Sequence, residues 1–62
     1  MWIVITSDGG RVTDICSEPD ARRAVHKLGF TQLRGPYSWD VVDNLGHKFV
    51  AEIRHGHGVT RP

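Results

Sequence analysis

The hydrophobic residues at the start of the chain predict a β-hairpin. Residues 2–6 read Trp-Ile-Val-Ile-Thr, and each of these residue types favours a strand. Residues 7–10 read Ser-Asp-Gly-Gly, and Asp-Gly between two strand-forming runs is typical of a tight hairpin turn. We therefore expect residues 11–16 to form the returning strand.

Two registers of this first hairpin fit the sequence. A two-residue loop at residues 8–9 places Ile5 opposite Val12, whereas a loop at residues 9–10 places Ile5 opposite Asp14, a less favourable pair. In the first register one face carries Trp2, Val4 and Ile15. The other face carries Ile3, Ile5, Val12 and Cys16. The pattern leaves open which face points inward.

The next segment has the spacing of an amphipathic helix. Ser17 is a favourable N-cap, and Asp20 approximates a capping box. The apolar residues that follow recur at helical spacing: Ala21, Ala24, Val25 and Leu28. Gly29 is placed to end the helix, with Phe30 as the hydrophobic contact beyond it. This pattern predicts a helix over residues 18–28.

The sequence predicts a second hairpin, and two features support the same register: the residues of its turn and the alternation of apolar and polar residues in its strands. Residues 43–46 read Asp-Asn-Leu-Gly, which fits a type I turn with glycine in the left-handed position and pairs Asp43 with His47. One face of the hairpin is then apolar throughout: Tyr37, Trp39, Val41, Phe49, Ala51 and Ile53. The other face mixes charged residues with Val42 and Val50. Residues 31–36 are ambiguous: the pattern leaves open a short edge strand over residues 31–34, with Leu33 inward and residues 35–36 ending it.

These elements predict a small α+β domain in the order ββα(β)ββ. We expect an antiparallel sheet with one helix packed on one face, formed by residues 1–54. Residues 55–62 have no periodicity and are expected to be a flexible tail. A single helix covers little more than one face of such a sheet, so the opposite face is expected to be solvated or to be an interface.

Composition narrows the class of protein. The chain has 62 residues and a net charge of +1, which argues against binding to nucleic acid or membranes by bulk electrostatics. Cys16 is the only cysteine, so no internal disulfide is expected, and a cytoplasmic location is the better expectation. The apolar run at residues 1–5 is too short for a signal peptide or a membrane span.

The sequence offers little chemistry for a metal, a cofactor or catalysis. The candidate ligands His26, His47, His55, His57 and Cys16 are scattered, and no zinc-binding spacing is present. Cys16 is more simply interpreted as a small buried hydrophobe. No nucleophile, base and orienting group occur together, so we expect no cofactor and no enzymatic activity.

One candidate surface is basic. Arg22, Arg23, His26 and Lys27 lie together on the polar side of the predicted helix, and Arg34 is expected nearby. Such a stripe can bind nucleic-acid phosphates or an acidic protein. No RNA-binding signature accompanies it, and charged residues on exposed helix faces need no special function. Nucleic-acid binding is therefore the alternative hypothesis.

The leading hypothesis is a protein-binding module. Its expected apolar contacts are Trp2, Val4, Ile15, Val42 and Val50, a set that would form a surface patch typical of a protein interface or a homodimer. Packing of Trp2 against the chain's own loop or tail is an equal alternative. The predicted plan is similar to that of many short accessory proteins of bacteria and phages, including small anti-CRISPR proteins and inhibitors of host polymerase. This resemblance is architectural, and it implies a regulator or inhibitor of a larger assembly.

Overall fold

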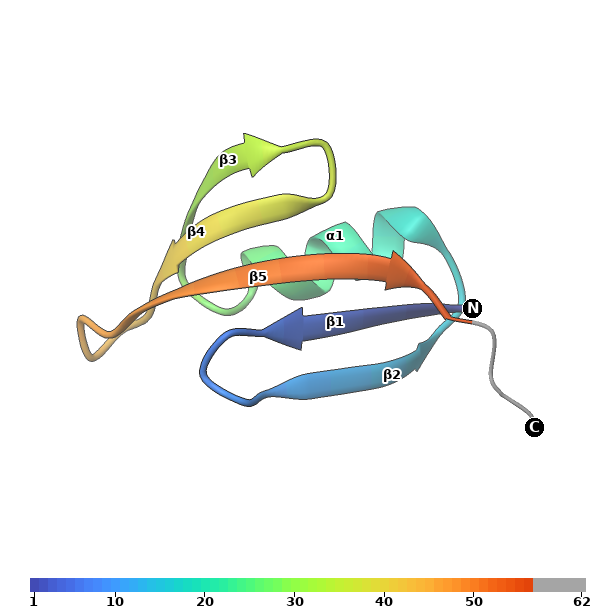
Figure 1. The fold of residues 1–62 in the computed structure, drawn as a ribbon, viewed down its shortest axis with the longest axis horizontal. Helices are drawn as coiled ribbons and strands as arrows, with labels where there is room; N and C mark the ends of the chain where they lie inside the picture. The colour runs from blue at the N-terminus through green and yellow to red at the C-terminus, as the bar shows by residue number, and fades with distance from the viewer. Residues whose placement is uncertain (57–62) are drawn as a thin grey trace.

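The computed structural model describes residues 1–56, which form one antiparallel sheet and one helix (Figure 1). The elements are β1 (Trp2–Thr6), β2 (Arg11–Ile15), α1 (Glu18–His26), β3 (Phe30–Gly35), β4 (Ser38–Val42) and β5 (Lys48–His55). The five strands lie in the order β2-β1-β5-β4-β3, so the last strand is central. The α+β prediction is confirmed, including the extra strand. No helix in the described part of the chain has the length and apolarity to cross a bilayer.

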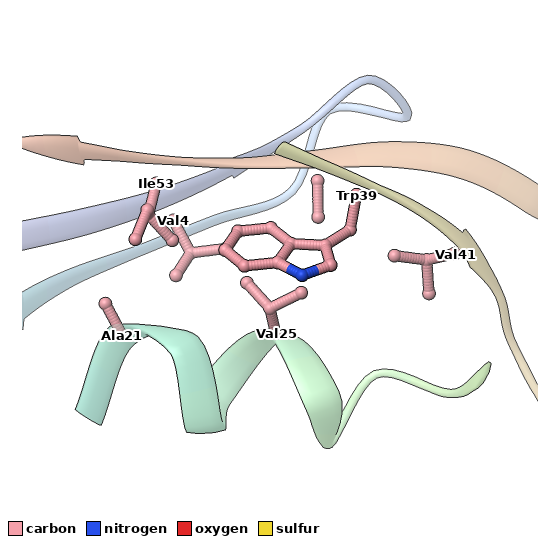
Figure 2. Close-up of a cluster of buried hydrophobic side chains, with 7 residues drawn as sticks. Val4, Ala21, Val25, Trp39, Val41 and Ile53 are labelled. Atoms are coloured by element: carbon pink, nitrogen blue, oxygen red, sulfur yellow. The ribbon is translucent and has the colours of Figure 1, made fainter. Parts of the chain in front are cut away.

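The core lies between α1 and one face of the sheet, here called the helix-side face. Its buried residues are Val4, Ala21, Val25, Trp39, Val41, Ala51 and Ile53. Figure 2 shows the Trp39 indole between the sheet and the helix, beside Val25. Trp39 is only 3% exposed and is the largest side chain of this core. Because α1 supplies only small and β-branched residues, one tryptophan fills much of the space between the layers.

The helix begins as predicted and ends earlier. The Ser17 hydroxyl accepts a hydrogen bond from the Asp20 backbone N–H at 3.3 Å, which caps the first turn. The helix ends at His26 rather than at residue 28, because the Leu28 N–H bonds to the Val25 carbonyl and tightens the last turn. Phe30 does not pack back onto the helix, since it is 84% exposed.

Gly29 makes the tight passage from the helix to β3. A Cβ atom at Gly29 would lie 2.2 Å from the Val42 carbonyl oxygen, and its φ of +154° also disfavours a side chain. Glycine is therefore needed at this position because the chain passes close to the backbone of β4. The sequence pattern predicted a different role, that of a residue that ends the helix.

The β4–β5 hairpin has the predicted turn and register. Asp43 N–H bonds to the His47 carbonyl and Gly46 N–H to the Asp43 carbonyl, each at 3.0 Å, and Gly46 has φ +83°. Val41 lies opposite Phe49 and Trp39 opposite Ala51, as expected. Tyr37 lies opposite Ile53 as predicted, but it is 46% exposed at the end of this face, beyond the core.

Next to its turn, the β1–β2 hairpin has neither of the two predicted registers, although its far end keeps the first one, with Ile15 opposite Trp2. Its loop has three residues, since the Thr6 N–H bonds to the Gly10 carbonyl at 2.9 Å and Gly9 occupies the left-handed region at φ +101°. Val4, and not Ile5, lies opposite Val12. An irregularity in the pairing between Trp2 and Val4 then returns Ile15 to a position opposite Trp2.

Candidate protein-binding surfaces

The five apolar residues expected to contact a partner do not share one surface. Val4 is 1% exposed in the core, and Trp2 and Ile15 pack against the core from the same side. Val42 and Val50 lie on the opposite face of the sheet, since they alternate with the buried Val41 and Ala51. The sequence allowed all five on one face only because it did not decide which face of the first hairpin is inward.

The face opposite the helix, here called the open face, carries its own apolar residues. Ile3 and Ile5 lie opposite Arg54 and Glu52 of β5, and they point away from the core because the neighbouring Val4 points into it. The apolar residues of the open face are Ile3, Ile5, Phe30, Val42 and Val50. No helix or strand among residues 1–56 covers this face, because the only helix packs on the other side.

A shallow groove crosses the open face where β4 and β5 meet. Val42 and Val50 contribute apolar lining, and Asp40 and Lys48 contribute opposite charges. Ser7 also lines the groove, and its hydroxyl accepts a hydrogen bond from the Val50 N–H at 2.9 Å. The groove therefore combines an apolar surface with one charge of each sign, which suits a protein side chain better than a phosphate.

An aromatic cluster ends the helix-side face beyond the core. The Trp2 ring lies 6.3 Å from the Tyr37 ring and 5.2 Å from the His55 ring, in an edge-on contact with the latter. Arg22 lies over the rings of Tyr37 and Trp39, at 5.6 and 5.5 Å from their centroids. Trp2 thus packs within its own chain, which was the alternative interpretation of this residue.

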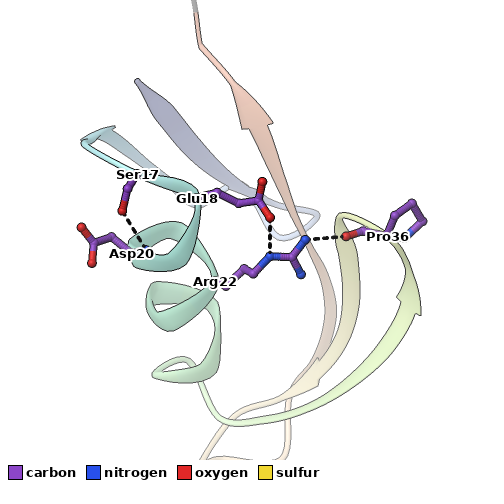
Figure 3. A network of polar contacts seen from close by, with 5 residues as sticks. All are labelled: Ser17, Glu18, Asp20, Arg22 and Pro36. Carbon is purple, nitrogen blue, oxygen red and sulfur yellow. Dashed lines mark hydrogen bonds and ion pairs between the residues drawn. The ribbon is translucent and has the colours of Figure 1, made fainter.

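Arg22 makes several contacts within its own chain. Its Nε donates to a Glu18 carboxylate oxygen at 2.9 Å, and another guanidinium nitrogen donates to the Pro36 carbonyl at 3.1 Å (Figure 3). The arginine therefore links the helix to the β3–β4 turn. The i, i+4 spacing of Glu18 and Arg22 is visible in the sequence, and it is the signal that predicts this pairing.

Three other members of the predicted basic surface also contact side chains of their own chain. Arg23 pairs with Asp20 at 3.2 Å, and His26 Nδ1 lies 2.7 Å from the Thr31 hydroxyl. Arg34 lies on β3 and pairs with Asp40 at 3.3 Å on the open face, away from the helix. Lys27 is exposed at the helix C-terminus. Arg34 therefore lies apart from the four helix residues that were expected to share a surface with it.

The candidate metal ligands do not converge. No group of three His, Cys, Asp or Glu side chains comes together within the described residues, and His57 lies outside them. Cys16 is exposed, so its interpretation as a buried hydrophobe was wrong. It follows Ile15, and side chains of adjacent residues at a strand end point in different directions.

The open face differs in one respect from the aromatic cluster and the basic residues. In those two groups, most polar side chains contact other residues of the same chain. By contrast, no helix or strand among residues 1–56 packs over the apolar side chains of the open face. The open face is thus the strongest candidate binding surface. Comparisons with protein-family models, with curated proteins and with solved structures find no match to this chain.

Proposed function

We propose that this protein is a non-enzymatic protein-binding module that regulates or inhibits a larger assembly, and that the partner packs on the open face of its sheet. The observation that carries the proposal is the row of apolar residues on that face. An antiparallel sheet with one face in water normally places polar residues there. Here Ile3, Ile5, Val42 and Val50 occupy four of those positions.

The composition of the open face supports a protein partner. Its apolar centre is flanked by charged residues of both signs, Lys48 and Arg54 beside Asp40 and Glu52. An apolar centre with a mixed polar rim is the usual anatomy of a protein interface. Contact with the groove would remove Val42 and Val50 from water, which is favourable by about 25 cal/mol for each Å² of apolar surface.

The alternative, nucleic-acid binding by the helix, has weaker support. Glu18 and Asp20 lie beside Arg22 and Arg23 and neutralise much of the field of the helix. A phosphate would have to displace these carboxylates before it could pair with either arginine. The alternative still makes a distinct prediction, because phosphate contacts give binding that falls steeply with salt.

The proposal is tested by pull-down from host lysate with a C-terminal tag, with and without nuclease. Val50→Lys places a charge in the groove, and its long side chain can reach solvent without unfolding the sheet. Val12→Lys is the matched control, since Val12 is 47% exposed on the edge strand β2. We expect wild-type protein and Val12→Lys to retain the same nuclease-resistant partner, and Val50→Lys to retain at most a tenth as much.

Two outcomes contradict the proposal. Equal retention by Val50→Lys, with an unchanged thermal midpoint, places the binding surface elsewhere. Loss of all partners after nuclease treatment supports nucleic-acid binding instead. In that case Arg22→Glu with Arg23→Glu should abolish retention.

A further inference from the structure

The two free edges of the sheet are unlike each other. The edge strand β2 is interrupted by an irregularity in its pairing with β1, and it holds Asp14 in the left-handed region at φ +63°. Bulges and charges of this kind protect an edge from pairing with another chain. The edge strand β3 pairs regularly with β4 from Phe30 to Leu33, and its irregularity comes only after Leu33.

The hydrogen bonds of the neighbouring strands identify the free backbone groups of β3. The Asp43 N–H bonds to the His47 carbonyl, and the Ile53 N–H bonds to the Tyr37 carbonyl. The backbone N–H and C=O groups of the odd-numbered residues of β4 therefore point towards β5. Even-numbered residues of β4 therefore face β3, where they lie opposite Phe30 and Gln32. The N–H and C=O groups of Thr31 and Leu33 consequently point away from the sheet.

Two large apolar side chains of this edge strand are exposed. Phe30 is 84% exposed on the open face, and Leu33 is 62% exposed on the helix-side face. Arg34 is the single charged residue of the strand, and it already pairs with Asp40 of β4. An exposed, regular strand with apolar side chains is a template for strand addition.

We propose that β3 pairs with β3 of a second copy of this chain, antiparallel, about a twofold axis through Gln32. In this register Thr31 of each copy lies opposite Leu33 of the other. These are the residues whose backbone groups face outward, so each such pair exchanges two hydrogen bonds and the interface contains about four. The strand's free backbone groups are thus complementary to themselves, which is why a second copy is the proposed occupant.

The side chains agree with the same register. Phe30 of each copy lies opposite Arg34 of the other on the open face, where a guanidinium can lie against an aromatic ring. The antiparallel arrangement keeps the two Arg34 side chains apart, whereas a parallel one would bring like charges together. The two sheets would become continuous, with both helices on one side and both open faces on the other. This inference does not depend on the proposed function.

A cysteine at the axis tests the register directly. Directly opposed residues that exchange no hydrogen bond have Cα atoms about 4.5 Å apart, within the range of a disulfide. We expect Gln32→Cys, made with Cys16→Ser, to form a disulfide-linked dimer on mild oxidation. Phe30→Cys, also with Cys16→Ser, is the matched control. Its two sulfur-bearing residues would be about 14 Å apart along the strand, too far to bridge.

The oligomeric state of the unmodified chain gives an independent test. Sedimentation of wild-type protein over a range of concentrations should show a monomer–dimer equilibrium. Leu33→Pro removes one outward N–H in each copy and leaves the pairing with β4 intact, so it should weaken dimerisation at least roughly tenfold. Gln32→Lys places two ammonium groups opposite each other at the axis, and it should also shift the equilibrium towards monomer.

Three results would overturn the proposal. A monomer at every concentration removes it outright. A dimer whose affinity is unchanged by both Leu33→Pro and Gln32→Lys uses another surface. Disulfide formation at Phe30→Cys that matches the rate at Gln32→Cys means that collisions, and not this register, bring the thiols together.

Discussion

The two hairpins of this protein have the same turn and different surroundings. Each closes with a three-residue loop whose last residue is a glycine with positive φ, +101° at Gly9 and +83° at Gly46. Beyond the turns they diverge. Strand β4 buries Trp39 and Val41, whereas four of the five residues of β2 are exposed and the fifth is half-buried.

This difference shows that the burial of side chains, and not the turn alone, determines how strictly the register of a strand is specified. In the β4–β5 hairpin, a shift of one residue would carry Trp39 and Val41 into water, so burial and turn specify the same pairing. In β2 only Ile15 is even half-buried, so a shift of register would expose little apolar surface. That strand accommodates an irregularity and a left-handed Asp14 at small cost. Strand β2 is therefore expected at the low end of local stability in this fold.

The largest expected effect comes from the same truncation in both hairpins. Val41 is 1% exposed and Val12 is 47% exposed. Val41→Ala should lower the free energy of unfolding by about 1.5–3 kcal/mol, because it removes buried methyl groups and leaves a cavity. Val12→Ala should cost less than about 0.5 kcal/mol. Urea unfolding measures both, and equal costs would contradict the contrast between the hairpins.

The two turn glycines should come next and should behave alike. A Cβ atom meets no atom within 4 Å at Gly9 or at Gly46, so alanine at either site is opposed only by its positive φ. Each substitution should destabilise the fold by about 1–2 kcal/mol. Thermal unfolding of both variants checks this. A much smaller loss for Gly9→Ala would mean that the first turn is often open in the native protein.

Asp14 provides a smaller test, and here the expected sign is reversed. Asp14 has φ +63°, which an L-residue adopts at some cost and glycine adopts freely. Asp14→Gly should therefore stabilise the protein by about 0.5 kcal/mol, and Asp14→Ala should destabilise it by a similar amount. If the two variants shift the thermal midpoint in the same direction, the backbone of β2 is not held in this conformation.

The smallest expected effect is the titration of the first turn. Asp8 accepts hydrogen bonds from the Thr6 hydroxyl and the Gly10 N–H, and these lower the pKa of its carboxyl group. A lowered pKa means that the contribution to stability is present above the ordinary pKa, about 3.9, and is lost as the pH falls through the lowered value. NMR titration of Asp8 should give a midpoint below the ordinary pKa, and Thr6→Val should raise it. An unchanged midpoint in Thr6→Val would remove the hydroxyl as the cause.

The candidate binding surface was only partly predictable. Val42 and Val50 were identified from alternation in the second hairpin, where the turn chemistry fixed the register. Ile3 and Ile5 were missed, because Trp2, Ile3, Val4 and Ile5 are all apolar and alternation cannot distinguish the two faces of such a strand. Only the pairing of Val4 with Ile53, in the core under α1, assigns the other two residues to the open face.

The sequence by itself determined the local elements: the capped start of the helix, the glycine turn of the second hairpin, and the place of the first turn but not its length. These follow from interactions between residues close together in the chain, which is why they can be read from spacing. Tertiary structure alone decided that β5 lies in the centre between β1 and β4, that Val4 is buried, and that Arg22 reaches Pro36. Those outcomes depend on contacts between segments that are far apart in the sequence. Such contacts form only when the whole core is assembled, so the spacing of residues along the chain does not reveal them.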